Sequence, residues 1–242
     1  MRTLLLTGAV VPVIGVLAGA VPAATVDVLA EADGSVWWNG LAFSIDSTGS
    51  TIRTTRSGAT SIRNGVYEFD LGGLPEGITI TGAILLLATS DLIGNTNSTA
   101  QVDAYALAGD GVVTASDHQN NTIGTMVATE TVPAGTVAEG GLPPGTAVAF
   151  EVLDVSPLQA AYEDTGTGRL TLRTQTFNFV TFSVHSLETA TAAVARPTLR
   201  VDYVPEPAGL LLLATGGMLA LRHRPQGRPQ SQRCRHGAYP ST

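Results

Sequence analysis

The chain has 242 residues, 44% of them hydrophobic and 14% charged, and its formal net charge is −7 at pH 7. Its 13 basic residues, all arginines, are outnumbered by 20 acidic ones, which excludes the strongly basic surface typical of nucleic-acid-binding proteins. The single cysteine, Cys234, excludes an internal disulfide framework and a cysteine-based metal site.

The N-terminal segment 1–24 is typical of a secretory signal peptide. Arg2 precedes an apolar stretch from Leu4 to Leu17, and the small residues that follow offer cleavage sites. Ala18-Gly19-Ala20 fits the A-x-A rule, whereas a cut after Ala23 or Ala24 leaves a strand-like start for the exported chain. We expect the later cut.

Residues 25–204 are predicted to form one all-β domain with a single core. Seven arginines and 19 acidic residues fall in this span, so its net charge is −12. Apolar and polar residues alternate in short runs that Gly- and Pro-rich turns separate, which indicates half-buried strands. The clearest runs are Val66–Leu71, Arg169–Arg173 and Val180–Val184. Such strands favour a jelly-roll-like β-sandwich.

One short helix is predicted at Ser156 to Tyr162. Ser156 can cap its N-terminus, and Pro157 suits the first helical position.

Alternation assigns the residues of the first run to two faces. Tyr67, Phe69 and Leu71 face the core, and Glu68 points outward or toward an arginine such as Arg63 or Arg200. Asp70, which precedes Gly72-Gly73, is expected to accept a hydrogen bond from the turn.

The C-terminal part carries a compact signal at residues 205–224. Val204-Pro205-Glu206-Pro207 leads into an apolar run from Ala208 to Leu221, and Arg222 and Arg224 follow. The run would span only ~21 Å as a helix, less than the ~30 Å hydrocarbon core of a bilayer. A plain membrane anchor is the alternative. Residues 225–242 form a polar tail, which we expect to be disordered and basic.

These C-terminal residues resemble the PEP-CTERM sorting signal of Gram-negative bacteria. The resemblance implies an exosortase-type sorting protease as a partner, with Val204, Pro205, Glu206, Pro207, Arg222 and Arg224 as the sorting motif. It also implies a precursor held in the inner membrane transiently by the C-terminal hydrophobic helix, then released to the cell surface or extracellular matrix.

The middle of the chain resembles a second family, the DNRLRE-type domains, which are jelly-roll modules similar to carbohydrate-binding domains. Four stretches match in order: Arg63 to Gly77, Ile78 to Leu87, Leu153 to Leu158, and Arg196 to Tyr203. The resemblance implies a sandwich fold found in extracellular proteins, some of which bind or accompany acidic glycans.

Catalytic motifs are absent from the sequence. It contains no H-x-x-H or H-E-x-x-H pair, no G-x-S-x-G elbow and no phosphate-binding glycine loop, so we expect neither an enzyme nor a cofactor. A polysaccharide lyase built from Tyr162, His185 and Arg173 is an alternative. Loops rich in Asp and Asn at 91–97 and 117–121 are candidates for structural calcium.

A glycan-binding face is predicted from a hairpin of Gly168–Thr174 with Phe179–His185. In that register Leu170 and Leu172 face the core, and the polar alternate residues share the opposite face. These residues are Arg169, Thr171, Arg173, Thr181, Ser183 and His185. The two arginines would suit successive carboxylates of an anionic polysaccharide. Alternatively, they pair with acidic residues on a neighbouring strand.

Trp37 and Trp38 are further candidates, because an exposed indole can stack on a sugar ring. Neighbouring residues of a strand point to opposite faces, so at most one of the two is expected in the core.

Together the sequence predicts an exported, surface-sorted, non-catalytic protein of the extracellular matrix or biofilm that binds acidic polysaccharide. The alternatives are a structural or adhesive surface protein without a defined glycan site and, with less support, a polysaccharide-degrading enzyme.

Overall fold

The computed structural model describes residues 22–90, 99–133, 142–177, 181–188 and 196–206. The chain divides into two units, Met1–Pro205 and Glu206–Thr242, and every element described below belongs to the first. The signal peptide, Pro207, Arg222, Arg224, the C-terminal hydrophobic run and the tail lie outside the described residues. Among the described residues, no helix is long and apolar enough to cross a membrane.

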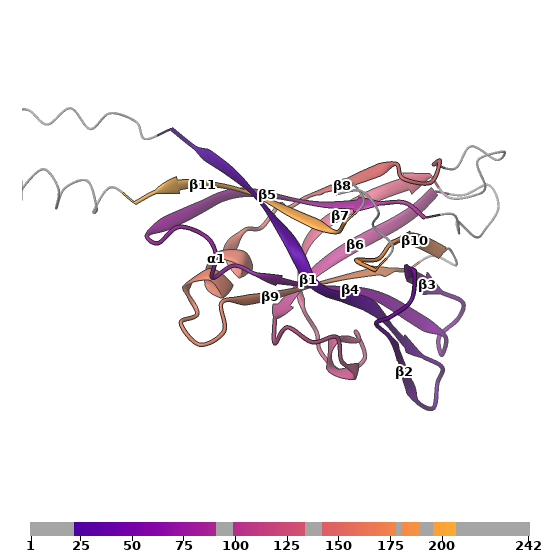
Figure 1. The fold of residues 1–242 in the computed structure, drawn as a ribbon. Coiled ribbons are helices and arrows are strands. Elements are labelled where there is room, and N and C mark those ends of the chain that lie inside the picture. The colour runs from indigo at the N-terminus through magenta and orange to yellow at the C-terminus, as the bar shows by residue number, and fades with distance from the viewer. Residues whose placement is uncertain (1–21, 91–98, 134–141, 178–180, 189–195, 207–242) are drawn as a thin grey trace, which may run out of the picture. The chain divides into compact units, whose positions relative to one another are not determined.

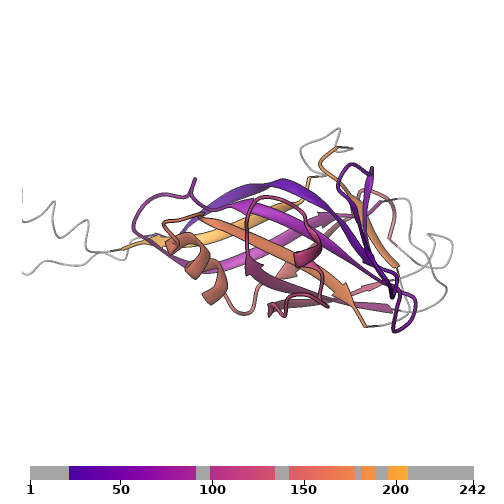
Figure 2. The ribbon, with the colours of Figure 1, turned by 90° about the horizontal axis from the view of Figure 1, so that it is seen from below.

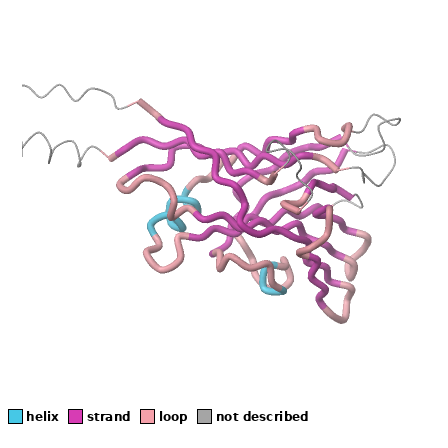
Figure 3. Tube along the Cα trace, in the orientation of Figure 1, coloured by secondary structure: helices cyan, strands magenta, loops and turns pink. Residues whose placement is uncertain are grey.

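Strands are the main secondary structure of the described part of the chain, which confirms the all-β prediction (Figure 3). The strands are β1 (Ala24–Trp38), β2 (Phe43–Asp46), β3 (Thr51–Arg56), β4 (Ile62–Asp70), β5 (Ile78–Ala88), β6 (Thr99–Ala108), β7 (Thr125–Pro133), β8 (Ala147–Glu151), β9 (Arg169–Thr176), β10 (Thr181–His185) and β11 (Thr198–Pro205). The helices are a 3₁₀ turn, η1 (Ala115–Asp117), and α1 (Ser156–Glu163).

All strand pairs are antiparallel, and the main path through the sheet runs β7-β6-β9-β4-β1-β11-β5-β8. β1 lies in the middle of this path and crosses from one half of the sheet to the other (Figure 1). Its first part, Ala24–Leu29, pairs with β11, and its second part, from Ala30 on, pairs with β4. The register shifts between Ala30 and Ala32, so Glu31 is the extra residue of a β-bulge.

The sheet is nearly closed around one apolar core. Just after β8, the amide of Leu153 donates to the carbonyl of Val127 in β7 (2.7 Å), which joins the two ends of the path. Side chains from both halves meet inside, among them Tyr67, Phe69 and Phe150, each fully buried. Tyr67, Phe69 and Leu71 therefore lie in the core as predicted.

The helix prediction is confirmed, but its cap differs. Ser156 is the first helical residue instead of the cap, and Val155 occupies the capping position. The carboxylate of Asp154 accepts the backbone amide of Ser156 (3.0 Å). An aspartate two residues upstream therefore takes the first free amide of the helix, in place of the Ser156 hydroxyl. The carboxylate of Asp70 accepts the amide of Gly72 (2.8 Å), which confirms its turn role.

The predicted hairpin of β9 with β10 is wrong. β9 lies between β4 and β6, whereas β10 pairs with β3. Alternation predicts which residues share a face of one strand, but it says nothing of the partner strand.

The outer face of β4 and β9 is covered by the segment 109–124, which includes η1 and lies across the strands in Figure 2. Gln119 donates its amide to the side chain of Asn64 (3.1 Å), and His118 contacts the carbonyl of Ile62 (3.2 Å). Glu68 is fully buried there and accepts the Gly111 amide and the Thr171 hydroxyl. The prediction that Glu68 points to solvent or to Arg63 or Arg200 is therefore wrong.

β3 and β10 form a two-stranded ribbon that packs on the inner face of β4. Ile52 and Thr54 approach the backbone of Gly65, and the hydroxyls of Thr54 and Thr174 lie 2.6 Å apart. Gly65 leaves the space that this crossing needs, since a Cβ there would lie 2.6 Å from the Thr174 Oγ1. The alternate residues Arg53 and Thr55 face away from the core.

We expect the Gly65→Ala variant to lose ~1–3 kcal/mol of unfolding free energy, because the added methyl overpacks the crossing of β3 over β4. Urea unfolding of the purified protein measures this. Gly73→Ala is the matched control, since nothing lies within 4 Å of a Cβ there. An equal effect of both variants would contradict the packing argument.

Asp33 should make stability depend on pH. It is 2% exposed, and burial raises its pKa to about 7 although the Leu187 amide donates to it (2.8 Å). A raised native pKa means that the folded state holds the proton longer. The stability that Asp33 contributes through its raised pKa is thus fully present below the unfolded pKa of about 3.9. It is lost as the pH rises to the folded pKa of about 7.

Asp33→Asn should therefore be more stable than the wild type at pH 8, by at most about 4 kcal/mol, and the difference should vanish near pH 4. Urea unfolding of both proteins across this pH range is the measurement. A difference that does not change with pH would refute the assignment.

Candidate functional site

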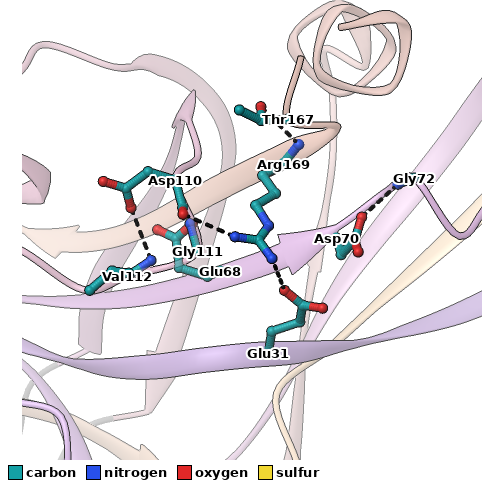
Figure 4. A network of polar contacts seen from close by, with 9 residues as sticks. All are labelled: Glu31, Glu68, Asp70, Gly72, Asp110, Gly111, Val112, Thr167 and Arg169. Carbon is teal, nitrogen blue, oxygen red and sulfur yellow. Dashed lines mark hydrogen bonds and ion pairs between the residues drawn. The ribbon is translucent and has the colours of Figure 1, made fainter. Parts of the chain in front are cut away.

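Arg169, the first residue of the predicted glycan face, is engaged in a network of internal contacts (Figure 4). Its Nη2 forms an ion pair with the Glu31 carboxylate (3.1 Å), and its Nη1 donates to the carbonyl of Asp110 (3.0 Å). The guanidinium lies against Gly111, where φ is 81° and a Cβ would collide with it. Arg169 thus pairs with an acidic residue, although Glu31 lies on β1 and not on a strand next to β9.

Thr171 and Arg173 are fully buried beneath the segment 109–124. The Nη1 of Arg173 donates to the carbonyls of Asp117 (3.1 Å) and Thr122 (2.8 Å), and its guanidinium lies over the ring of Tyr105 at 5.4 Å. Burial lowers the pKa of Arg173 to about 10, against the attraction of Tyr105 and Asp117. The side chain therefore holds the covering segment in place and does not face solvent.

Thr181, Ser183 and His185 lie on β10, away from the arginines of β9. Thr181 and His185 are half-buried, and Ser183 is fully buried. The six residues predicted as one cationic face are thus divided between two strands with different partners, and the predicted face does not form.

Both tryptophans are half-buried and belong to different surroundings. Trp38 packs on Phe43, with ring centroids 4.7 Å apart. The Nε1 of Trp37 donates to the Ser61 hydroxyl (3.4 Å), and the Arg63 guanidinium lies over the Trp37 ring at 5.4 Å. Neither is in the core, in keeping with the prediction that at most one would be.

A polar pocket of about 220 Å³ opens beside Trp37. Its lining residues are Trp37, Arg53, Thr55, Ser57, Ser61, Arg63 and Thr181. Strand register explains why they meet: Trp37 lies opposite Arg63, Arg63 opposite Thr55, and Thr55 opposite Thr181. Four residues from β1, β4, β3 and β10 therefore form one row across the sheet, and Arg53 lies two positions before Thr55 on the same face.

Arg53 and Arg63 give the pocket a positive charge. Burial and the nearby charge of Arg53 lower the pKa of Arg63, whereas Asp46 in β2 raises it. No ion pair joins Arg53 or Arg63 to a carboxylate within the part of the chain that the structure describes. Two guanidinium groups that repel each other favour an anion between them.

Hydrogen bonds hold the polar residues of the pocket in place. The Thr55 hydroxyl donates to the Thr181 hydroxyl (2.9 Å). The backbone amide of Ser57 donates to the backbone carbonyl of Ser61 (2.8 Å) and closes the turn that carries both serines. Hydroxyls that donate and accept suit the hydroxyls of a sugar.

Of the residues that line the pocket, the sequence predicted Trp37 and Thr181 and missed the other five. Arg53, Thr55, Ser57, Ser61 and Arg63 lie in one Ser- and Thr-rich stretch that also contains Arg56. Alternation within Thr51–Arg56 already puts Arg53 and Thr55 on one face, but their meeting with Arg63 depends on the turn between β3 and β4.

The other predicted sites have less support. Within the described ranges, no three His, Cys, Asp or Glu side chains gather where a metal ion could bind. Residues 91–97 lie outside those ranges. Two residues of the alternative lyase site have other partners. The Tyr162 hydroxyl donates to the carbonyl of Pro75 (2.8 Å), and Arg173 donates to the carbonyls of Asp117 and Thr122. In the sorting motif, Val204 and Pro205 end β11, and Glu206 follows it.

Comparison of the chain with models of protein families finds no match, and comparison with curated proteins finds none either.

We expect Arg173→Ala to lower the free energy of unfolding by ~2–5 kcal/mol, because it leaves the buried carbonyl of Asp117 and the half-buried carbonyl of Thr122 without this donor. Arg169→Ala should cost less than about 1 kcal/mol, because its ion pair with Glu31 is exposed. Urea unfolding separates the two. A small effect of Arg173→Ala would show that the covering segment does not depend on this side chain.

Proposed function

We propose that this protein is exported, sorted to the cell surface, and binds acidic polysaccharide of the extracellular matrix or biofilm without catalysing a reaction. The observation that carries the binding proposal is the pocket with Arg53, Arg63 and Trp37. It combines two arginines that form no ion pair with a described residue, hydroxyls and an indole, which are groups that bind acidic sugars.

The position of the pocket fits surface display. Ala24 lies opposite Tyr203, so the start of β1 and the end of β11 are neighbours at one end of the sheet. Trp37 lies thirteen positions further along β1, roughly 40 Å away at ~3.3 Å per residue, and β2 and β3 lie toward that far end (Figure 1). A protein tethered through residues after β11 would hold the pocket away from its attachment point.

The family resemblances are part of the proposal. We assign residues 25–204 to a DNRLRE-type jelly-roll-like β-sandwich, supported by the two sheet halves joined through β1 and by the order of the matched stretches, which fall on β4, β5, α1 and β11. We assign residues 1–24 to a signal peptide and residues 205–224 to a PEP-CTERM signal read by an exosortase-type protease. The end of β11 at Pro205 supports this division.

A polysaccharide array probed with the purified protein at low and moderate salt tests the binding. We expect salt-sensitive binding to uronate-rich polymers that Arg53→Ala with Arg63→Ala abolishes. Arg169→Ala with Arg200→Ala is the matched control, because it removes the same two charges outside the pocket, where Arg169 pairs with Glu31 (3.1 Å) and Arg200 pairs with Asp27 (2.8 Å). Equal loss in the control would indicate a general charge effect, and no binding to any glycan would favour a purely structural surface protein.

A further inference from the structure

We propose that the pocket recognises one sugar residue through a single anionic substituent, a carboxylate or a sulfate ester, held between Arg53 and Arg63 beside the Trp37 indole. This inference rests on the proposed function and narrows it, since it makes the monosaccharide, and not the charge density of the polymer, the unit of recognition.

The register places the two arginines for a shared anion. Thr55 lies opposite Arg63, and Arg53 is two positions away on the same face, so the two arginines are diagonal neighbours. Diagonal positions of this kind are ~7–8 Å apart, within reach of long side chains. Because guanidinium forks bind carboxylate and sulfate-like oxygens in pairs of hydrogen bonds, two forks can share one such group.

Three other arginines of the described residues have partners that these two lack. Arg169 pairs with Glu31, Arg200 pairs with Asp27, and Arg173 donates to two carbonyls. Arg63 instead lies over the Trp37 ring, half-buried and beside another positive charge. Asp46 attracts Arg63 but forms no ion pair with it, so an anion supplied from outside would be the direct partner that both arginines lack among the described residues.

The size of the pocket limits the ligand. About 220 Å³ is less than the ~300–1,000 Å³ of pockets that enclose drug-sized molecules, so the pocket has room for about one sugar ring, and the rest of a polysaccharide would lie outside it. The row of hydroxyls at Thr55 and Thr181 borders this space and can bind ring hydroxyls.

Trp37 offers a direct signal for the test. In a Trp38→Phe background it is the sole tryptophan of the chain, which has two. We would titrate this protein with glucuronate, glucose 6-sulfate and glucose at constant ionic strength and follow indole fluorescence. We expect saturable changes with one or both anionic sugars and none with glucose.

Variants then test the arginines. Arg53→Ala and Arg63→Ala should each weaken binding of the anionic sugar by about 10- to 100-fold, as loss of a charge-assisted hydrogen bond predicts. Arg53→Lys and Arg63→Lys, which retain charge but lose the fork, should weaken it less, and Arg200→Ala should leave it unchanged. Thermal unfolding of each variant identifies any that fails to fold. If an alanine variant does not fold, the lysine variant at the same position tests whether that arginine contributes to binding.

The outcomes separate this inference from the proposed function. A preference for glucuronate identifies the anion as a carboxylate, and a preference for glucose 6-sulfate identifies it as a sulfate ester. If uronate polymers bind in an Arg53- and Arg63-dependent way while neither monosaccharide binds or competes, single-residue recognition is wrong and the proposed function stands. If neither polymer nor monosaccharide binds, both are wrong. Equal binding of glucose also overturns the inference.

Discussion

The bulge at Glu31 determines which way the second part of β1 faces, and much of the structure depends on it. Before the bulge, Ala30 lies opposite Phe69 and faces the core; after it, Ala32 lies opposite Glu68 on the outer face. One extra residue therefore exchanges the two faces of the strand. As a result Trp37 joins Arg63 on the inner side. The ion pair of Glu31 with Arg169 links the bulge to β9 and to the loop at Asp110.

The covered outer face shows how an acidic protein accommodates buried polar groups. Alternation along β4 and β9 puts Glu68, Thr171 and Arg173 on the face opposite the core, where a two-layer fold would expose them. The segment 109–124 covers them and supplies backbone partners, namely the Gly111 amide for Glu68 and two carbonyls for Arg173. Because each charged group there has hydrogen-bond partners, the cost of its burial is partly offset.

Unlike the covered outer face, the pocket is open to solvent. It lies where the ribbon of β3 and β10 leaves part of the inner face uncovered. Arg53 and Arg63 lie at this edge without an ion-pair partner among the described residues, in a span whose net charge is −12. Two neighbouring cations without ion pairs are costly for stability and useful for binding. The same contrast separates Arg173, which stabilises the fold, from the two arginines of the pocket.

The sequence alone determined the all-β class, the strands at Val66–Leu71 and Arg169–Arg173, the core residues of β4 and the helix at Ser156, because each depends on periodicity or local hydrogen bonding. Only the tertiary structure decided that β10 pairs with β3, that a loop buries Glu68 and Arg173, and that Arg53 meets Arg63 beside Trp37. These features depend on long-range strand pairing and on the β-bulge at Glu31, which exchanges the two faces of β1. Local alternation carries no information on either, since it repeats identically whichever strand lies alongside.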